Sequence, residues 1–246
     1  MCWSGEASTV LAGIGIGTTI VAARRGEDFR LWMPLGYFSL MEALQAFTYA
    51  VIDDCASPAN QVATLLGWIH VAFQPLLANL ISMYFIPRHV RCAIEGWVYA
   101  IVSMAVVVML VNIYPFTWAP ACREGLDVFC GERLCSVRGD WHIAWEMHRS
   151  MVAYGGMSYI LTAFVLPLLY GSWRMTLYHI VTGPFLAFVT TRNPNEFAAV
   201  WCLYSIGLLL VVAKTPVRKW LFVTRWPGYG WVGRRMVTIN CAGQRS

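Results

Sequence analysis

The sequence predicts an all-α, polytopic integral membrane protein that crosses the bilayer seven times. Apolar residues make up 58% of its 246 residues and only 13% are charged, whereas a soluble domain has about 25% charged residues. The mean hydropathy is +0.56. Runs of about 20 apolar residues recur, and each could cross ~30 Å of hydrocarbon. They lack the short alternating segments of a transmembrane β-barrel.

Seven apolar segments are the expected spans: 8–23, 31–52, 62–86, 97–114, 151–171, 175–191 and 198–214. The first is short enough for a signal peptide, but the preceding MCWSGEA has no Lys or Arg, so we expect a retained helix. Gly183 and Pro184 interrupt the sixth span. The chain has no internal repeat or low-complexity tract, which predicts a single membrane domain over residues 1–246.

The basic residues predict the orientation. Thirteen of the eighteen Lys and Arg residues follow the first, third, fifth and seventh spans, and basic residues favour the cytoplasmic side. We therefore expect an outer N-terminus and a cytoplasmic C-terminus, in a bacterial inner membrane or its equivalent. The basic, Trp-rich tail at 215–246 is typical of a membrane interface. The net charge of +5 thus indicates the lipid bilayer as partner and requires no nucleic acid.

The segment 115–150 is the only long loop, and its cysteines predict an ordered outer cap that disulfides stabilise. Disulfides persist outside the cytosol, and the orientation places five cysteines outside: Cys2, Cys55, Cys122, Cys130 and Cys135. We expect Cys122 to pair with Cys130 or Cys135, and Cys2 with Cys55. Some of them being free thiols is the alternative, and an odd number leaves at least one unpaired or bonded to another chain. From Trp141 onward we expect a helix that continues into the fifth span.

Glu42 lies in the middle of the second span, where a carboxylate is costly and usually faces the protein interior. Spacings of three and four residues place it on one helix face with Ser39, Gln45, Tyr49 and Asp53. In the third span His70 and Gln74 also share a face, and Pro75 leaves a backbone carbonyl free near His70.

Glu42 and His70 are predicted to lie at the same depth. Both are about 20 Å from the turn near Ala56, at 1.5 Å per helical residue, and helices joined by so short a turn are normally neighbours. We therefore expect Glu42, His70 and Gln74 to form a catalytic centre. The alternative is a structural pair that holds the two helices together, worth about 0.6–2 kcal/mol.

A second cluster lies at the end of the outer loop, in WHIAWEMHRS. His142 and Glu146 would share one face of the expected helix, and His148 would point the other way. Two ligands four residues apart plus a third from elsewhere are compatible with zinc. The expected metal ligands are therefore His70, Glu42, His142, Glu146 and His148, with zinc as the expected metal. A solvated helix that packs the loop is the alternative.

The segments MCWSGEAS, SLMEALQAF, IDDCASPANQ and IHVAFQP resemble an uncharacterised multi-pass membrane family of unknown function, mainly over the first three spans. This resemblance implies no activity. The predicted topology is also similar to that of the alkaline ceramidase and adiponectin-receptor zinc hydrolases. That superfamily has an HxxxH pair in its last helix, whereas 198–214 contains no histidine.

Two functions follow from these observations. The first is a membrane-embedded, metal-dependent hydrolase or oxidoreductase that acts on a lipid or hydrophobic substrate at Glu42 and His70. The alternative is a non-enzymatic transporter, sensor or accessory subunit with partner membrane subunits, in which Glu42 and His70 are a structural or proton-responsive pair. The chain has no Walker A, GxSxG, CxxC or kinase motif, and no Lys in the middle of 198–214 for a retinal Schiff base.

Overall fold

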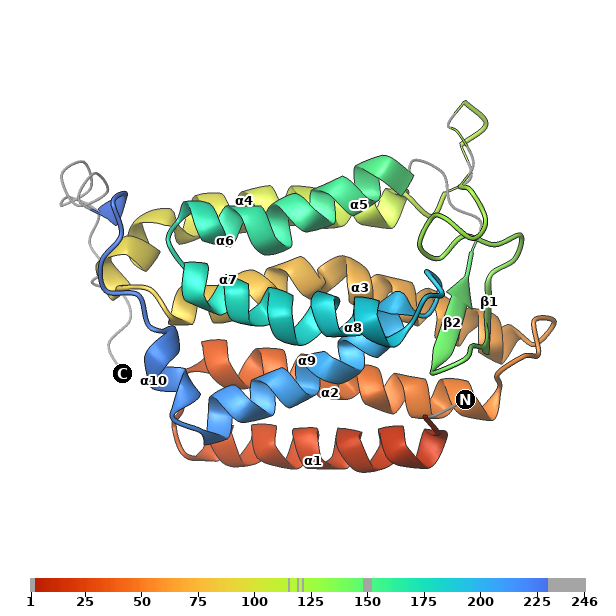
Figure 1. Cartoon of the computed structure of the whole chain (residues 1–246), viewed down its shortest axis with the longest axis horizontal. Helices are drawn as coiled ribbons and strands as arrows, with labels where there is room; N and C mark the ends of the chain where they lie inside the picture. Colours follow the sequence, from red (N-terminus) through yellow and green to blue (C-terminus); the bar gives the residue numbers. More distant parts are fainter. Residues whose placement is uncertain (1–2, 115, 119, 121, 148–151, 230–246) are drawn as a thin grey trace.

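The computed structural model describes residues 3–114, 116–118, 120, 122–147 and 152–229. Long helical rods lie side by side, and the described N-terminal residues and a small sheet lie at one end of them (Figure 1). Five helices form a rod each: α1 (Gly5–Arg24), α2 (Phe29–Ala50), α3 (Pro58–Tyr84), α4 (Arg88–Val111) and α9 (Phe197–Lys214). A short helix, α10 (Val217–Leu221), lies at the opposite end from the sheet (Figure 1).

Two further rods are interrupted by π-helical turns. The first consists of α5 (Val152–Ile160), η1 (Leu161–Val165) and α6 (Leu166–Leu169). The second consists of α7 (Trp173–Ile180), η2 (Val181–Phe185) and α8 (Leu186–Thr190). The η2 turn contains Pro184, which cannot donate a helical hydrogen bond. The interruption expected from the sequence is therefore a local change in helix type within one rod.

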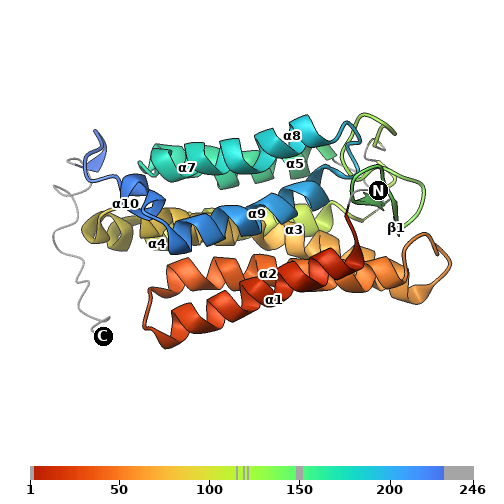
Figure 2. The same ribbon diagram turned by 60° about the horizontal axis from the view of Figure 1, so that its bottom comes forward.

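Local sequence signals explain where the first helices begin. The Ser4 hydroxyl accepts a hydrogen bond from the amide of Ala7 at 3.3 Å, and the Asp28 carboxylate accepts one from the amide of Arg30 at 2.9 Å. Such caps satisfy backbone donors that the first helical turn leaves free. Pro58 occupies the first position of α3, where the missing amide hydrogen has no cost. α1 then runs along α2 (Figure 2).

By length and composition, four of the described helices could cross a membrane: α1, α3, α4 and α9. The sequence predicts seven spans, whereas helix length and hydropathy support four among the described helices. The polar residues Arg30, Glu42 and Gln45 lower the hydropathy of α2. The π turns divide the other two rods into helices that are too short to qualify alone.

The long loop at 115–150 contains an antiparallel pair of strands, β1 (Cys135–Arg138) and β2 (Ile143–Glu146). The helix expected from Trp141 onward is therefore wrong for residues 143–146. The amide of Gly139 donates to the carbonyl of His142 at 2.9 Å, which closes a tight hairpin. Ile143 and Trp145 are buried, and these β-branched and aromatic residues suit a strand that packs on a core.

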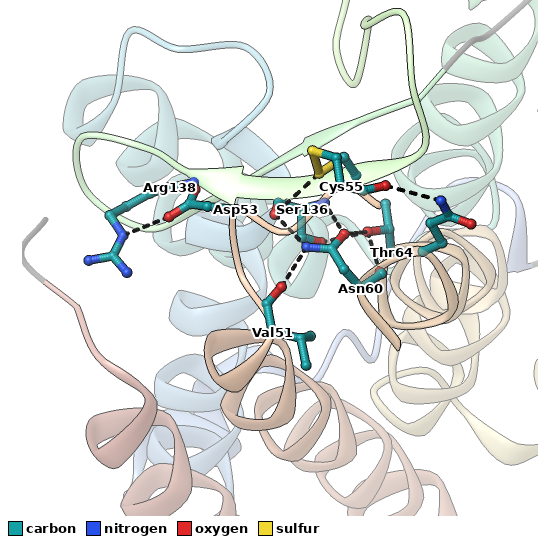
Figure 3. Close-up of a disulfide and its surroundings, with 9 residues drawn as sticks. Val51, Asp53, Cys55, Asn60, Thr64, Ser136 and Arg138 are labelled. Atoms are coloured by element: carbon teal, nitrogen blue, oxygen red, sulfur yellow. Dashed lines mark hydrogen bonds and ion pairs between the residues drawn. A yellow bond between two sulfur atoms is a disulfide. The ribbon is translucent and has the colours of Figure 1, made fainter. Parts of the chain in front are cut away.

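The hairpin is attached to the turn between α2 and α3 (Figure 3). The Asn60 side-chain amide donates to the carbonyls of Val51 and Ser136, each at 2.9 Å, and its oxygen accepts from the amide of Ser136 at 2.8 Å. A disulfide joins Cys55 to Cys135 beside this contact. The sheet is thus fixed to the bundle by a covalent bond and by buried hydrogen bonds.

The observed disulfides differ in part from the expected ones. Cys122 pairs with Cys130, one of the two partners expected for it, across a separation of 8 residues. Cys55 pairs with Cys135, across 80 residues, rather than with Cys2. Cys2 lies outside the described residues, as do His148 and 230–246 of the predicted tail. The second bond could not be foreseen because it depends on the hairpin that brings Cys135 to the α2–α3 turn.

Candidate functional site

Glu42 is fully buried, with 0% of its surface exposed. Neither of its carboxylate oxygens forms a hydrogen bond of good geometry with a described residue. Ser8 of α1 interacts with the Glu42 carboxyl group, and the Ser8 hydroxyl accepts a hydrogen bond from the indole of Trp3 at 2.7 Å. Gln45, one turn further along α2, is also fully buried, and neither end of its amide has a described partner.

The predicted contact between Glu42 and His70 does not form. Neither carboxylate oxygen of Glu42 nor Nε2 of His70 has a partner among the described residues. The His70 ring instead stacks on Tyr37, with 3.8 Å between the ring centroids, and the Tyr37 hydroxyl donates to the His70 carbonyl at 2.6 Å. Tyr37 and Glu42 are five residues apart, about 140° around the helix, so the two side chains face different neighbours.

The hydrogen bonds of Gln74 go to residues other than its predicted partners. Gln74 is 4% exposed, its amide nitrogen donates to the thiol of Cys202 at 3.0 Å, and its oxygen accepts from the hydroxyl of Tyr159 at 2.8 Å. Gln74 therefore connects α3 with α5 and α9. Neither Tyr159 nor Cys202 stands out in the sequence, because each lies among apolar residues and belongs to no recognisable motif.

His142 and Glu146 lie at opposite ends of the hairpin strand, so they do not share a helix face. His142 immediately precedes β2, is 1% exposed, and its Nδ1 is hydrogen-bonded to the Tyr49 hydroxyl at 2.8 Å. Burial lowers the pKa of His142 to about 3, because the charged imidazolium would lose its hydration. Glu146 is partly exposed, and burial and then Glu124 raise the pKa of its carboxyl group.

We use the name polar centre for a group of four residues: His142, Tyr49, Glu42 and Ser8. Tyr49 and Glu42 are seven residues apart on α2, so they lie on one side of this helix two turns apart. His142 stacks on Tyr49 at 5.7 Å between ring centroids, and its Nε2 has no described partner. The polar centre thus extends from the outer hairpin to the buried carboxyl group of α2, along the side of α2 that α1 covers.

Residues 6–222 match the model of a family of unknown function, DUF5765. The chain belongs to this family. The match agrees with the sequence resemblance to an uncharacterised family, and nothing links the chain to the ceramidase and adiponectin-receptor proteins. No curated protein and no solved structure matches it. The matched range contains the whole polar centre of this DUF5765 member.

The metal site predicted from the sequence has no support in this DUF5765 member. Within the described part of the chain, no group of three or more His, Cys, Asp and Glu side chains could hold a metal ion. His70, Glu42, His142 and Glu146 are dispersed over different contacts. The described residues therefore do not supply the three or four ligands that protein zinc sites use.

Proposed function

We propose that this protein is a non-enzymatic, proton-responsive membrane protein, either a transporter or a sensor, in which Glu42 takes up and releases a proton. The observation that carries this proposal is the fully buried carboxyl group of Glu42, which forms no ion pair with a described residue and has the Ser8 hydroxyl beside it. An unpaired buried carboxylate costs several kcal/mol, so the group is stable when it holds a proton or meets a cationic or donor solute. Ionisable groups inside membrane helices are typical of proton relays and ion pathways.

The polar centre contains residues that could carry protons between Glu42 and one end of the bundle. Tyr49 and His142 lead from the side of α2 that carries Glu42 to the hairpin at the end of the bundle. A neutral imidazole has one nitrogen that accepts and one that donates, so His142 could receive a proton on one nitrogen and release it from the other. We infer that Glu42 exchanges protons with the outer side through these two groups.

The metal-dependent enzyme that the sequence also predicts would need Glu42 and His70 to share a ligand. They have different neighbours, and the described residues offer no third metal ligand beside either of them. The geometry therefore favours the transporter or sensor over the hydrolase or oxidoreductase.

The proposal includes all seven rods as membrane spans, with the N-terminus outside in a bacterial inner membrane or its equivalent. Val152–Leu169 and Trp173–Thr190 each contain 18 residues, about 27 Å at 1.5 Å per residue, close to the ~30 Å hydrocarbon thickness. Both rods lie alongside the other helices (Figure 2). The lipid bilayer is then the main partner, and additional membrane subunits are compatible with this arrangement.

Infrared difference spectroscopy tests the proposed role of Glu42 in protein reconstituted into liposomes. On changing from acidic to alkaline pH, we expect loss of the carbonyl stretch of a protonated, buried carboxylic acid. Glu42→Gln should remove this band, and Glu132→Gln, in the exposed part of the outer loop, should keep it. A band that is unchanged in Glu42→Gln would refute the proposal.

Proton flux into the same liposomes separates the two versions of the proposal. A transporter predicts flux above that of empty liposomes, lost in Glu42→Gln and kept in Glu132→Gln. A sensor predicts the infrared change together with a pH-dependent change in tryptophan fluorescence, both lost in Glu42→Gln, and no flux.

A further inference from the structure

An apolar pocket lies apart from the polar centre, between α3, α4, α5, α9 and the outer loop. Its volume is about 150 Å³, and none of Ser8, Glu42, Tyr49 or His142 lines it. Apolar cavities of this size can hold one benzene ring. The pocket therefore accommodates the volume of a single aromatic ring.

Five aromatic side chains contribute to the pocket wall: Trp68, Phe129, Tyr159, Phe197 and Trp201. Trp201 makes edge-to-face contacts with Tyr159 and Phe197, with ring centroids 5.3 Å and 5.9 Å apart. On another side, Trp68 and Phe129 meet at 5.6 Å and an interplanar angle of 81°. These aromatic side chains present ring edges and ring faces to the pocket. They favour a flat aromatic ligand, because each aromatic pair stabilises by about 0.5–1.5 kcal/mol beyond the effect of the buried area.

Gln74 places a side-chain amide among the mostly apolar residues that line this space. Its hydrogen bonds to Cys202 and Tyr159 hold the amide in one orientation. A side-chain amide has two N–H donors and an oxygen with two lone pairs, so a donor and an acceptor remain beyond the two bonds observed. A ligand with a ring oxygen could use them, whereas a saturated acyl chain could not.

The pocket opens on the side of α5. Gly156 and Ile160 both line it, Ile160 is 52% exposed, and a side chain added at Gly156 would meet nothing within 4 Å. The adjacent Met157 is 56% exposed. If α5 crosses the bilayer, as proposed above, this apolar rim faces acyl chains. A ligand would then enter sideways from the hydrocarbon region.

We infer that this pocket binds a membrane-dissolved quinone or phenol with a single ring, which places a ring oxygen on the Gln74 amide. The ring would fill the aromatic walls, and an attached alkyl tail would leave through the opening at Gly156. This inference is one of binding, and it goes beyond the proton response proposed for Glu42.

Equilibrium binding of a radiolabelled benzoquinone with a decyl tail tests the inference on the full chain in detergent micelles. The wild type should bind it saturably, with one molecule per chain. Gly156→Leu, which fills the opening, should weaken binding at least tenfold. Gln74→Met, which keeps the side-chain length, should weaken it about five- to tenfold through loss of one hydrogen bond. Gly13→Leu is the matched control because a side chain at Gly13 also meets open space, and it should bind as the wild type does.

Two results would overturn the inference. Equal binding by the wild type and Gly156→Leu would show partition into the micelle rather than occupation of the pocket. Competition by decanol as strong as that by unlabelled quinone would show that the pocket selects alkyl chains rather than rings. Glu42→Gln should bind the quinone normally, so failure of the proton proposal and failure of this one are separate outcomes.

Discussion

At the scale of single residues, the chain buries polar groups whose partners are only partly provided by other described residues. The cost of a carboxylate in apolar surroundings predicts that Glu42 lies inside the bundle, and it is fully buried. Its neighbours could not be predicted in the same way, because equal depth on two helices says nothing about their rotation. Tyr37, rather than Glu42, is on the side of α2 that faces His70.

The buried imidazole of His142 predicts a pH-dependent stability. The pKa of His142 is about 3 in the folded protein and 6.5 in the unfolded chain. Below pH 6.5 the unfolded state therefore binds more protons, and the free energy of unfolding decreases as the pH is lowered. The expected loss from this group is about 2 kcal/mol at pH 5, since one pKa unit corresponds to about 1.4 kcal/mol. Thermal unfolding at pH 7 and pH 5 should show a smaller fall for His142→Gln than for the wild type.

His89→Gln is the control for that measurement, because His89 is exposed at the start of α4. It should keep the full pH dependence of the wild type. An equal fall in melting temperature for His142→Gln and the wild type would contradict the assignment.

At the scale of elements, α1 and α2 pack closely at several glycines, and Gly15 lies at the tightest of these contacts. A side-chain carbon at Gly15 would overlap the Ser39 hydroxyl, whereas one at Gly13 would meet nothing within 4 Å. Small residues allow membrane helices to approach closely, but the sequence does not indicate which of the neighbouring glycines lies at the contact. That choice follows from the rotation of α1.

Gly15→Ala and Gly13→Ala form a matched pair of variants for this contact. Overpacking at Gly15 should cost about 1–3 kcal/mol, and Gly13→Ala should be neutral or slightly stabilising because alanine favours helix. Thermal unfolding in detergent measures both. Equal melting temperatures for the two variants would contradict the packing described here.

The hairpin is the element that helical spacing misassigned. His142 and Glu146 are four residues apart, which suggests one helix face, but the turn at Gly139 and the strand-forming residues Ile143 and Trp145 decide the local structure. The reason for pairing His142 with Glu146 as metal ligands is therefore lost, because the two side chains lie at opposite ends of a strand.

The two disulfides are expected to contribute unequally to stability. In the chain-entropy model a bond across 80 residues contributes about 4.5 kcal/mol, and one across 8 residues contributes about 2.5 kcal/mol. The double variant Cys55→Ser/Cys135→Ser should therefore be less stable than Cys122→Ser/Cys130→Ser by about 2 kcal/mol. Denaturant unfolding of the two variants checks the order, and the reverse order would contradict it.

At the scale of the whole molecule, the helical fold predicted from composition is confirmed, and four helices could cross a membrane, but the predicted seven spans are not supported. Hydropathy measures each helix alone, whereas α2 can bury its polar side against α1 and other helices (Figure 2). The interrupted rods fail the same measure because π turns shorten each helix. The aromatic pocket could not be predicted, since its walls come from four helices and a loop.

Reporter fusions distinguish seven spans from four. Alkaline phosphatase fused after residue 57 or 194 should be active, because both connections would lie outside. Green fluorescent protein fused after residue 87 or 171 should fluoresce, because both would lie in the cytoplasm. The fusion after 194 tests the interrupted rods directly, and an inactive phosphatase there would contradict the seven-span arrangement.

The covalent bond between Cys55 and Cys135 has a consequence for biogenesis. During synthesis at about 5–20 residues per second, Cys55 is made roughly 4–16 s before its partner, because 80 residues separate them. Cys122 and Cys130 are both made within that interval, so each is available to Cys55 before Cys135 exists. Maturation of the outer hairpin therefore depends on a disulfide isomerase or on delayed oxidation, and a host that lacks both should accumulate wrongly paired chains.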